Sequence, residues 1–170
     1  QKAVALPPGL AVSIVSQRAL DKCRTVTDRG YYFDYDAMLK RYDKDFQTPT
    51  TPAVSLFWAL DLELDHIVKE GMQNRYQRHL EMAKFTREWT AKYFKVYAEP
   101  GYESVTLTTV ANTRNIVVKD LNGELGKRGM QISNGYGDIK EKTFRIAHMG
   151  DLTMADMKEV TAAIVDVLKL

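Results

Sequence analysis

The order of helix-like and strand-like patterns after about residue 72 is the feature that most constrains the fold. The periodicity predicts a long helix over 72–96, a strand over 104–110, a helix over 115–126, strands over 130–133 and 143–148, and a last helix from Thr153. On the long helix, apolar residues recur at helical spacing at Met82, Phe85, Trp89 and Tyr93. An apolar face of a helix must pack against another element, and a sheet formed by the short strands could provide that surface. The pattern predicts a small domain of mixed α/β (α+β) class, with its sheet covered by helices.

The last of these helices carries start signals of its own. Thr153 is a suitable N-cap residue, and Asp156 stands where the acidic partner of a capping box belongs. Leu152 and Met157 are spaced as a hydrophobic staple. We therefore expect a helix start at Thr153.

The first 71 residues lack the elements of a self-sufficient domain. The β-branched run AVSIV (11–15) predicts one buried strand, and helical stretches follow it at 16–25 and from Asp36. Pro52 suits the first position of another helix, which would be capped by Thr51 and broken at Gly71. We therefore divide the chain into residues 1–71, a remnant of a larger domain with an interdomain helix, and residues 72–170, a small carboxy-terminal α/β domain.

Two features indicate that this chain is part of a larger body. The helix from Pro52 begins with AVSLFWAL (53–60), which is apolar on nearly all sides, as in segments buried inside a protein or at a subunit interface. The chain also opens at Gln1 without a methionine and runs into an apolar, proline-stiffened stretch, whereas natural termini are usually polar and mobile. We expect residues 1–170 to be the carboxy-terminal portion of a longer protein.

Composition and charge exclude several classes of function. The 170 residues carry a net charge of +2, from 24 basic and 22 acidic residues, which gives no electrostatic case for binding nucleic acid or an anionic membrane. The single cysteine, Cys23, rules out an internal disulfide and argues against a thiolate zinc site. No apolar run is long enough to cross a bilayer. We expect a cytoplasmic protein without a metal.

The pair Gln1-Lys2 is the first candidate for chemistry. A lysine becomes a nucleophile or a Schiff-base partner when burial lowers its pKa, and the following AVALPPG could supply apolar surroundings. Most lysines near a chain end are simply solvated, so this feature alone favours the structural interpretation.

The stretch QTPTTP (47–52) is the second candidate. Its hydroxyls and amide precede the predicted start of a helix, where free N–H groups and the helix dipole favour an anion such as phosphate. The alternative is that the threonines only cap the helix, for which one of them would suffice.

The stretch TFRIAHMGD (143–151) is the third candidate. On a strand, Phe144 and Ile146 share one face and Arg145 points to the other, from which its guanidinium could bind a carboxylate. The alternative is a surface arginine on a half-exposed sheet. His148 and Asp151 suggest metal binding or acid–base chemistry only weakly. His66 and His79 lie on predicted helices, have no useful ligand spacing, and are expected at the surface.

Together these three stretches resemble the class V aminotransferases, which are fold-type I enzymes dependent on pyridoxal 5'-phosphate. The likeness is to the branch of alanine–glyoxylate and serine–glyoxylate (serine–pyruvate) aminotransferases. QKAVALPPGLAVSIVS resembles the Schiff-base segment of that branch, QTPTTPAVSL its loop and helix start, and FRIAHMGD the segment with its substrate-binding arginine. Their order and rough spacing agree over essentially the whole chain.

The resemblance implies a role for each site residue. Lys2 would form a Schiff base with the cofactor and then act as the general base, while Gln1 would help to hold the cofactor phosphate. Thr50 and Gln47 would bind the phosphate of the neighbouring subunit's cofactor in a homodimer, although some relatives carry tyrosine in place of Gln47. Arg145 would bind the substrate carboxylate.

The resemblance also implies the reaction and the parts that it still requires. An amino group would pass from alanine or serine to a 2-oxo acid such as glyoxylate or pyruvate. The family's amino-terminal part supplies a glycine-rich turn, a ring-stacking aromatic residue and an aspartate at the pyridine nitrogen. We therefore expect the isolated chain to be inactive.

Other functions remain open on the sequence. Cysteine desulfurases need a reactive cysteine on a mobile loop well after the lysine, whereas Cys23 lies in a predicted helix, which argues against them. Phosphoserine and aspartate aminotransferases and lyases of class V remain possible. A different alternative is a non-catalytic α/β module for binding or dimerisation, which would have to cover the apolar residues 53–60 and remain monomeric.

Overall fold

The computed structural model describes residues 1–170, which form two compact units. Gln1 and Leu6–Leu62 make up the first unit, and Lys2–Ala5 together with Glu63–Leu170 make up the second. The boundary lies within helix α3 (Val54–Glu70). None of the helices is long and apolar enough to span a membrane.

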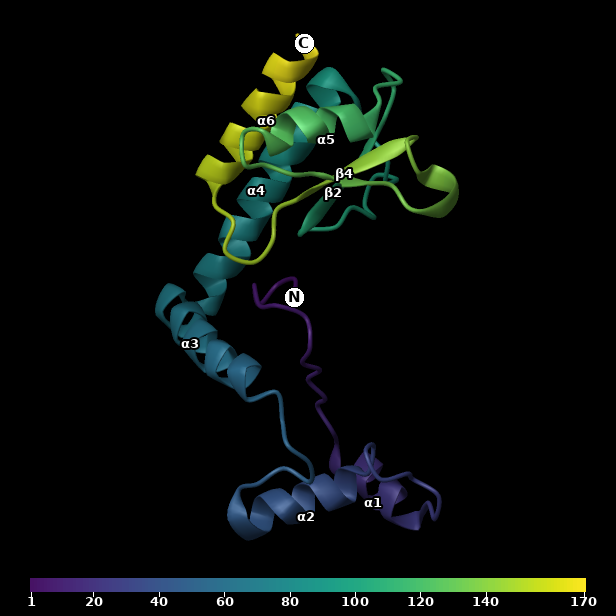
Figure 1. The fold of residues 1–170 in the computed structure, drawn as a ribbon, viewed down its shortest axis with the longest axis vertical. Coiled ribbons are helices and arrows are strands. Elements are labelled where there is room, and N and C mark those ends of the chain that lie inside the picture. The colour runs from purple at the N-terminus through teal and green to yellow at the C-terminus, as the bar shows by residue number, and fades with distance from the viewer. The chain divides into compact units, whose positions relative to one another are not determined.

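A four-stranded antiparallel sheet forms the centre of the second unit (Figure 1). Its strands lie in the order β1 (Lys95–Val96), β2 (Leu107–Ala111), β4 (Thr143–Ala147) and β3 (Ser133–Asn134). Val110 pairs with Phe144, and Thr109 pairs with Arg145. Because successive side chains alternate between the two faces of a sheet, Phe144 and Ile146 share the core face and Arg145 lies on the other, as predicted.

Three helices cover the core face of this sheet: α4 (Met72–Tyr93), α5 (Val118–Gly126) and α6 (Met154–Leu168). Met82 and Trp89 of α4, with Ile164 of α6, pack into the same apolar core as the strand residues. Phe94, directly after α4, meets Phe144 edge to face at 5.2 Å between ring centroids. The predicted α/β domain, with its sheet covered by helices, is confirmed.

Local signals explain where these helices begin and end. The predicted capping box is confirmed: the Thr153 hydroxyl accepts from the backbone N–H of Asp156, whose carboxylate accepts from the backbone N–H of Thr153. Gly71, at φ +82°, breaks the chain between α3 and α4 as predicted. The prediction that α4 reaches Val96 is wrong, because Lys95–Val96 pair with β2 instead.

The first unit contains α1 (Gln17–Thr25), α2 (Tyr35–Asp45) and the first half of α3. The Ser16 side chain caps α1, and the Asp34 side chain caps α2. The predicted buried strand over 11–15 is wrong: the segment is irregular, with Val12 83% and Ile14 100% exposed. The first unit has no strand to pair with it, and β-branched residues favour a strand only where neighbouring strands and packing partners exist.

Helix α3 begins at Val54 and not at Pro52 as predicted. The Ala53 carbonyl accepts the first hydrogen bonds of the helix, from the backbone N–H groups of Leu56 and Phe57, so Thr51 does not cap it. Val54, Phe57 and Trp58 are exposed, with 73% of Trp58 accessible. We call the face formed by Val54, Phe57, Trp58 and Leu62 the apolar face of α3.

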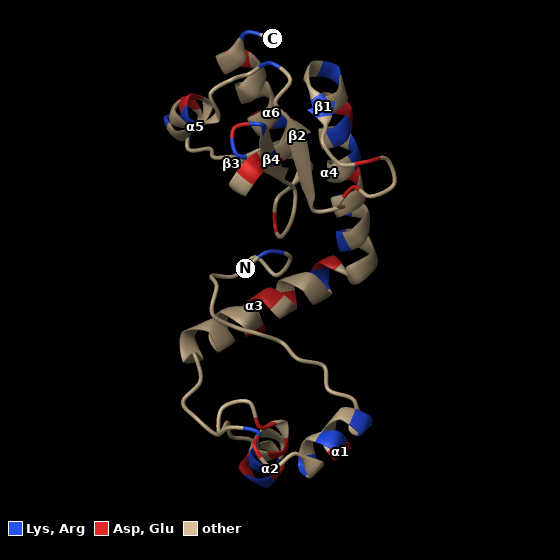
Figure 2. Cartoon of the chain, turned by 90° about the vertical axis from the view of Figure 1, so that its right-hand side faces the viewer, with Lys and Arg blue, Asp and Glu red and all other residues tan.

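Charged residues of both signs are mixed along the helices (Figure 2). The 24 basic and 22 acidic residues of the sequence nearly balance.

Candidate functional site

Lys2 lies in a tight turn of the second unit. The backbone N–H of Ala5 donates to the Lys2 carbonyl oxygen at 3.2 Å and closes the turn, and the Lys2 side chain is exposed. The turn lies so close to Gly150 that a Cβ atom added to Gly150 would be only 3.0 Å from the Lys2 carbonyl oxygen. Gly150 also has φ +68°, so that both space and backbone conformation favour glycine there.

Arg145 lies on β4, on the sheet face opposite the helical core. Its Nε donates to the Asn134 carbonyl oxygen at 2.9 Å, and its guanidinium carbon lies 4.0 Å from the centroid of the Tyr136 ring. No carboxylate of the chain forms an ion pair with Arg145. A planar guanidinium that is held at Nε and stacked on an aromatic ring keeps two parallel donors for a carboxylate.

The side chain of Asn134 is itself fixed. Its Oδ1 accepts from the backbone N–H groups of Gly135 at 2.8 Å and Glu141 at 2.9 Å, and its Nδ2 donates to the Glu141 carboxylate. The other Glu141 oxygen accepts from the backbone N–H of Val118, in the first turn of α5. The residue that orients Arg145 is thereby tied to the core of the unit.

Tyr136 is influenced by the charges of Lys2, the predicted catalytic residue, and of Arg145, the predicted substrate-binding residue. Hydrogen bonding by the Arg145 guanidinium and its positive charge hold the pKa of the Tyr136 phenol below its ordinary value, and the positive charge of Lys2 adds to this effect. Both charges therefore act at the same phenol. The structure places the Lys2 turn against Gly150, in the turn that follows the strand carrying Arg145, although the two residues are 143 positions apart in the sequence.

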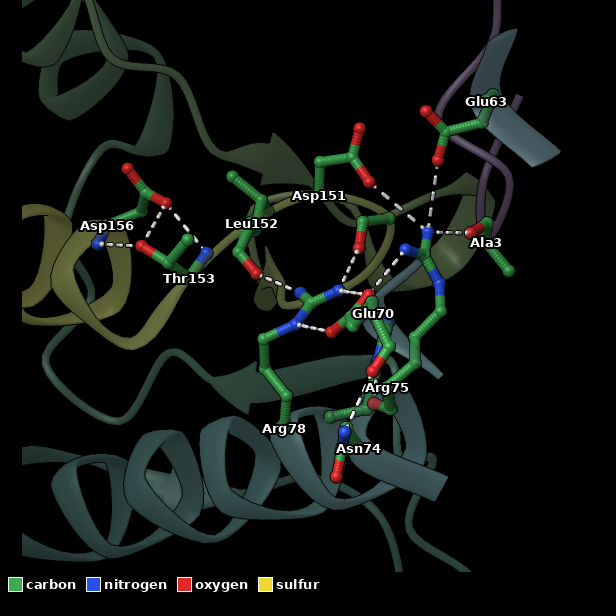
Figure 3. Close-up of polar contacts among 12 residues, drawn as sticks. Ala3, Glu63, Glu70, Asn74, Arg75, Arg78, Asp151, Leu152, Thr153 and Asp156 are labelled. Carbon is green, nitrogen blue, oxygen red and sulfur yellow. Dashed lines mark hydrogen bonds and ion pairs between the residues drawn. The ribbon is translucent and has the colours of Figure 1, made fainter. Parts of the chain in front are cut away.

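A partly buried ionic cluster centred on Arg75 contacts Ala3, the residue after Lys2, and no sequence pattern predicted it (Figure 3). Arg75, only 5% exposed, donates to the Ala3 carbonyl oxygen at 2.8 Å and to Glu70 at 2.9 Å. The Arg75 Nη2 also lies 3.3 Å from Asp151 and 3.5 Å from Glu63. One guanidinium thus meets the Lys2 turn and three carboxylates.

Arg78 completes the cluster one turn further along α4. Its Nε and Nη2 donate to the two oxygens of Glu70 at 2.6 Å and 3.0 Å, while its terminal nitrogens also donate to the carbonyl oxygens of Gly150 and Leu152. The hydrogen bond from Arg78, supported by one from Arg75, lowers the pKa of Glu70 to about 2 against the opposing effect of burial. Glu70 is therefore ionised at neutral pH, as the two arginines require.

The predicted phosphate-binding residues Gln47 and Thr50 lie in the first unit, in the loop before α3. Both are exposed. The Thr48 hydroxyl donates to the Thr50 carbonyl oxygen at 2.6 Å and the Tyr31 hydroxyl to that of Pro49 at 3.3 Å, so the loop has internal order. None of these threonines caps α3, and the Thr50 hydroxyl makes no hydrogen bond within the chain. Gln1, also predicted to bind phosphate, is exposed as well.

The three histidines differ in environment. His66 is exposed, as predicted. The prediction that His79 lies at the surface is wrong: it is 7% exposed, and its Nδ1 lies 2.7 Å from the Arg75 carbonyl oxygen. His148 is completely buried, with its Nε2 2.8 Å from the Thr108 hydroxyl, and burial lowers its pKa to about 4.

Cys23 lies on α1 in the first unit, as predicted for a helical position. It is half-buried, and its sulfur lies 3.8 Å from a carboxylate oxygen of Asp34. This position on a regular helix is unlike the mobile-loop cysteine expected of a desulfurase.

The sequence is similar to those of known aminotransferases. No family model matches the sequence. An uncharacterized aminotransferase of Methanocaldococcus jannaschii is 36% identical over 167 residues, which are 96% of this chain and 43% of that protein. A serine–glyoxylate aminotransferase of Arabidopsis thaliana is 29% identical over 174 residues, covering 99% of this chain and 43% of that protein. The chain thus spans less than half the length of these curated relatives.

A solved structure supports the same assignment. The crystal structure of pyridoxamine–pyruvate aminotransferase from Mesorhizobium loti superposes with a TM-score of 0.88 at 27% identity, over 98% of this chain and 44% of that one. Sequence and fold together therefore show that the chain is similar to the carboxy-terminal portion of class V, fold-type I aminotransferases, among them serine–glyoxylate and alanine–glyoxylate aminotransferases.

Proposed function

We propose that the whole protein is a pyridoxal-phosphate-dependent aminotransferase, which transfers an amino group from a small amino acid, alanine or serine, to a 2-oxo acid such as glyoxylate or pyruvate. The observation that carries this proposal is that the Lys2 turn lies against the turn following the Arg145 strand, while no carboxylate of the chain pairs with the Arg145 guanidinium. The relatives named as aminotransferases support it.

The residues present fit the cofactor. An exposed amine on a fixed turn, an arginine that no carboxylate of the chain neutralises and an exposed Thr50 hydroxyl are groups that such a site needs. Bound pyridoxal phosphate supplies the electron sink that stabilises negative charge on the substrate α-carbon. Every other role falls to protein side chains.

Each site residue then has a distinct role. Arg145 binds the substrate carboxylate through its two terminal nitrogens and so fixes which α-hydrogen points towards Lys2. The Lys2 amine takes the proton from the α-carbon of the amino donor. It later delivers a proton to the carbon of the 2-oxo acid that receives the amino group. Gln1 binds the phosphate in the same subunit, whereas Gln47 and Thr50 bind the phosphate of the partner subunit in a cytoplasmic homodimer. The isolated chain is accordingly inactive.

The first experiment is to find which lysine carries the cofactor. The whole protein is incubated with pyridoxal phosphate, reduced with borohydride, digested, and analysed by mass spectrometry. We expect a pyridoxyl group on Lys2, and its loss in Lys2→Arg. The matched control Lys119→Arg alters an exposed lysine that makes no ion pair, and should label at Lys2 as the parent protein does.

Cofactor on a different lysine, or on none, would overturn the aminotransferase proposal. Once Lys2 is labelled, the amino donor is tested by supplying alanine, serine, aspartate or phosphoserine with glyoxylate and measuring glycine formation. Turnover with aspartate or phosphoserine but not with alanine or serine would replace the proposed substrates while retaining the reaction class.

A further inference from the structure

We propose that Arg75 is a positioning residue that fixes the Lys2 turn relative to the strand that carries Arg145. The inference rests on the proposed function, because it assigns Arg75 a part in the same reaction. Arg75 touches neither reacting group directly. It acts through the backbone beside Lys2 and through the turn after β4 (Figure 3).

A single side chain links three parts of the sequence. Arg75 stands in the first turn of α4, and its Nη2 reaches Ala3, 72 positions earlier, and Asp151, 76 positions later. Ala3 directly follows Lys2, and Asp151 lies four residues after the end of β4. The position of the lysine backbone relative to the arginine strand therefore depends on this guanidinium.

The contacts differ in strength. The bond to the Ala3 carbonyl oxygen is short, at 2.8 Å, and is assisted by the charge of a guanidinium that is 95% buried, which makes it one of the stronger kinds of protein hydrogen bond. The Asp151 carboxylate lies 3.3 Å away with 57% of its side chain exposed, so that solvent weakens this contact. Arg75 therefore fixes the Lys2 turn chiefly through Ala3.

The turn after β4 is anchored independently of Asp151. Arg78 donates to the carbonyl oxygens of Gly150 and Leu152 on either side of it, and Glu70 joins Arg78 to Arg75. Gly150 in turn lies against the Lys2 carbonyl. The two segments are thus held by a shared ionic cluster on one side and by a close backbone contact on the other.

Lysine cannot replace Arg75 in this arrangement. The guanidinium offers donors on two terminal nitrogens, of which Nη1 bonds Glu70 while Nη2 bonds Ala3. A lysine has one nitrogen and cannot occupy both positions at once. Arg75→Lys therefore retains the positive charge among the carboxylates but loses the link to the Lys2 turn.

Loss of this link should affect the proton transfer more than substrate binding. Displacing a catalytic group by about 1 Å can cost on the order of 100-fold in rate, even when the altered residue lies outside the chemistry. Arg145, which binds the carboxylate, keeps its own supports at Asn134 and Tyr136. We expect Arg75→Lys to lower kcat by about tenfold or more, while KM for the amino acid changes less than about threefold.

The test uses the whole protein loaded with pyridoxal phosphate, together with a readout that needs no cofactor. Hydrogen exchange at the backbone N–H of Ala5, which closes the Lys2 turn, is measured in Arg75→Lys and in Arg87→Lys. Arg87 lies on the same helix and bonds only the Ser104 carbonyl oxygen, at 3.3 Å, so it is a matched control. We expect faster Ala5 exchange and lower kcat in Arg75→Lys alone.

A second pair of variants covers the case in which Arg75→Lys does not fold. Gly150→Ala would place a Cβ atom 3.0 Å from the Lys2 carbonyl oxygen and should likewise speed Ala5 exchange. Gly129→Ala imposes similar strain at φ +75° but meets no atom within 4 Å, and should leave that exchange unchanged.

The possible failures can be told apart. If the parent protein carries no pyridoxyl group on Lys2, the proposed function fails whatever Arg75 does. If Lys2 is labelled but Arg75→Lys keeps the Ala5 exchange rate and kcat of the parent, the positioning role is wrong and the aminotransferase stands. Equal effects of Arg75→Lys and Arg87→Lys would also overturn it, since they would report general destabilisation.

Discussion

At the scale of single residues, His148 makes the stability of the second unit depend on pH. It is fully buried, only its Nε2 has a hydrogen-bonding partner, and burial lowers its pKa to about 4. An unfolded chain would release this histidine to its ordinary pKa of about 6.5. Between these two values the unfolded chain binds the proton and the folded chain does not, so stability falls as pH falls.

We therefore expect the free energy of unfolding to decrease between pH 6.5 and pH 4, by about 3 kcal/mol at most from this group. Urea denaturation at several pH values measures it. His148→Gln removes the titrating group and should flatten the profile, whereas His66→Gln, at an exposed position, should not. An unchanged slope in His148→Gln would assign the pH dependence to other residues, such as Glu70.

Single residues also differ in how well the sequence predicts them. Lys2 and Arg145 were predicted as site residues because their residue types stand in recognisable stretches, and the Lys2 turn lies against the turn that follows the Arg145 strand. Arg75 was missed because an arginine on a helix is usually solvated, and its decisive partner lies 72 positions away. The faint signal available was the group Glu70, Arg75 and Arg78 around the helix break at Gly71.

At the scale of elements, the sequence predicts a helix end correctly where that end depends only on neighbouring residues. The capping box at Thr153 and the break at Gly71 depend on neighbouring residues and were predicted. The strand predicted over 11–15 does not form, and the strand at Lys95–Val96 was not predicted, because each outcome depends on whether a partner strand exists. The prediction that Thr51 caps α3 was wrong because the helix begins two residues later, with Ala53 supplying the first carbonyl that accepts a helical hydrogen bond.

The capping box gives a prediction for α6. Thr153→Ala removes the hydroxyl that accepts from the backbone N–H of Asp156 and donates to its carboxylate, and should lower the free energy of unfolding by about 1 kcal/mol. Chemical denaturation measures the change. Thr113→Ala, at an exposed threonine whose side chain makes no hydrogen bond, is the control and should change it little. Equal stability of the two variants would mean that packing alone fixes this helix end.

At the scale of the whole molecule, the apolar face of α3 distinguishes an autonomous module from part of a larger enzyme. Phe57 is 46% and Trp58 73% exposed in this chain. A free-standing module would have to cover such a surface to remain monomeric, because large exposed apolar patches favour association. In the proposed homodimer the rest of the protein and the partner subunit cover it.

We therefore expect the 170-residue chain alone to self-associate as its concentration rises, and Phe57→Ser with Trp58→Ser to reduce that association. Sedimentation velocity over a range of concentrations measures it. Tyr102→Ser removes an aromatic ring that is 83% exposed in the second unit, and should leave the association unchanged. A chain that stays monomeric throughout would favour the non-catalytic module, since its apolar helix would then need neither a larger domain nor a second subunit.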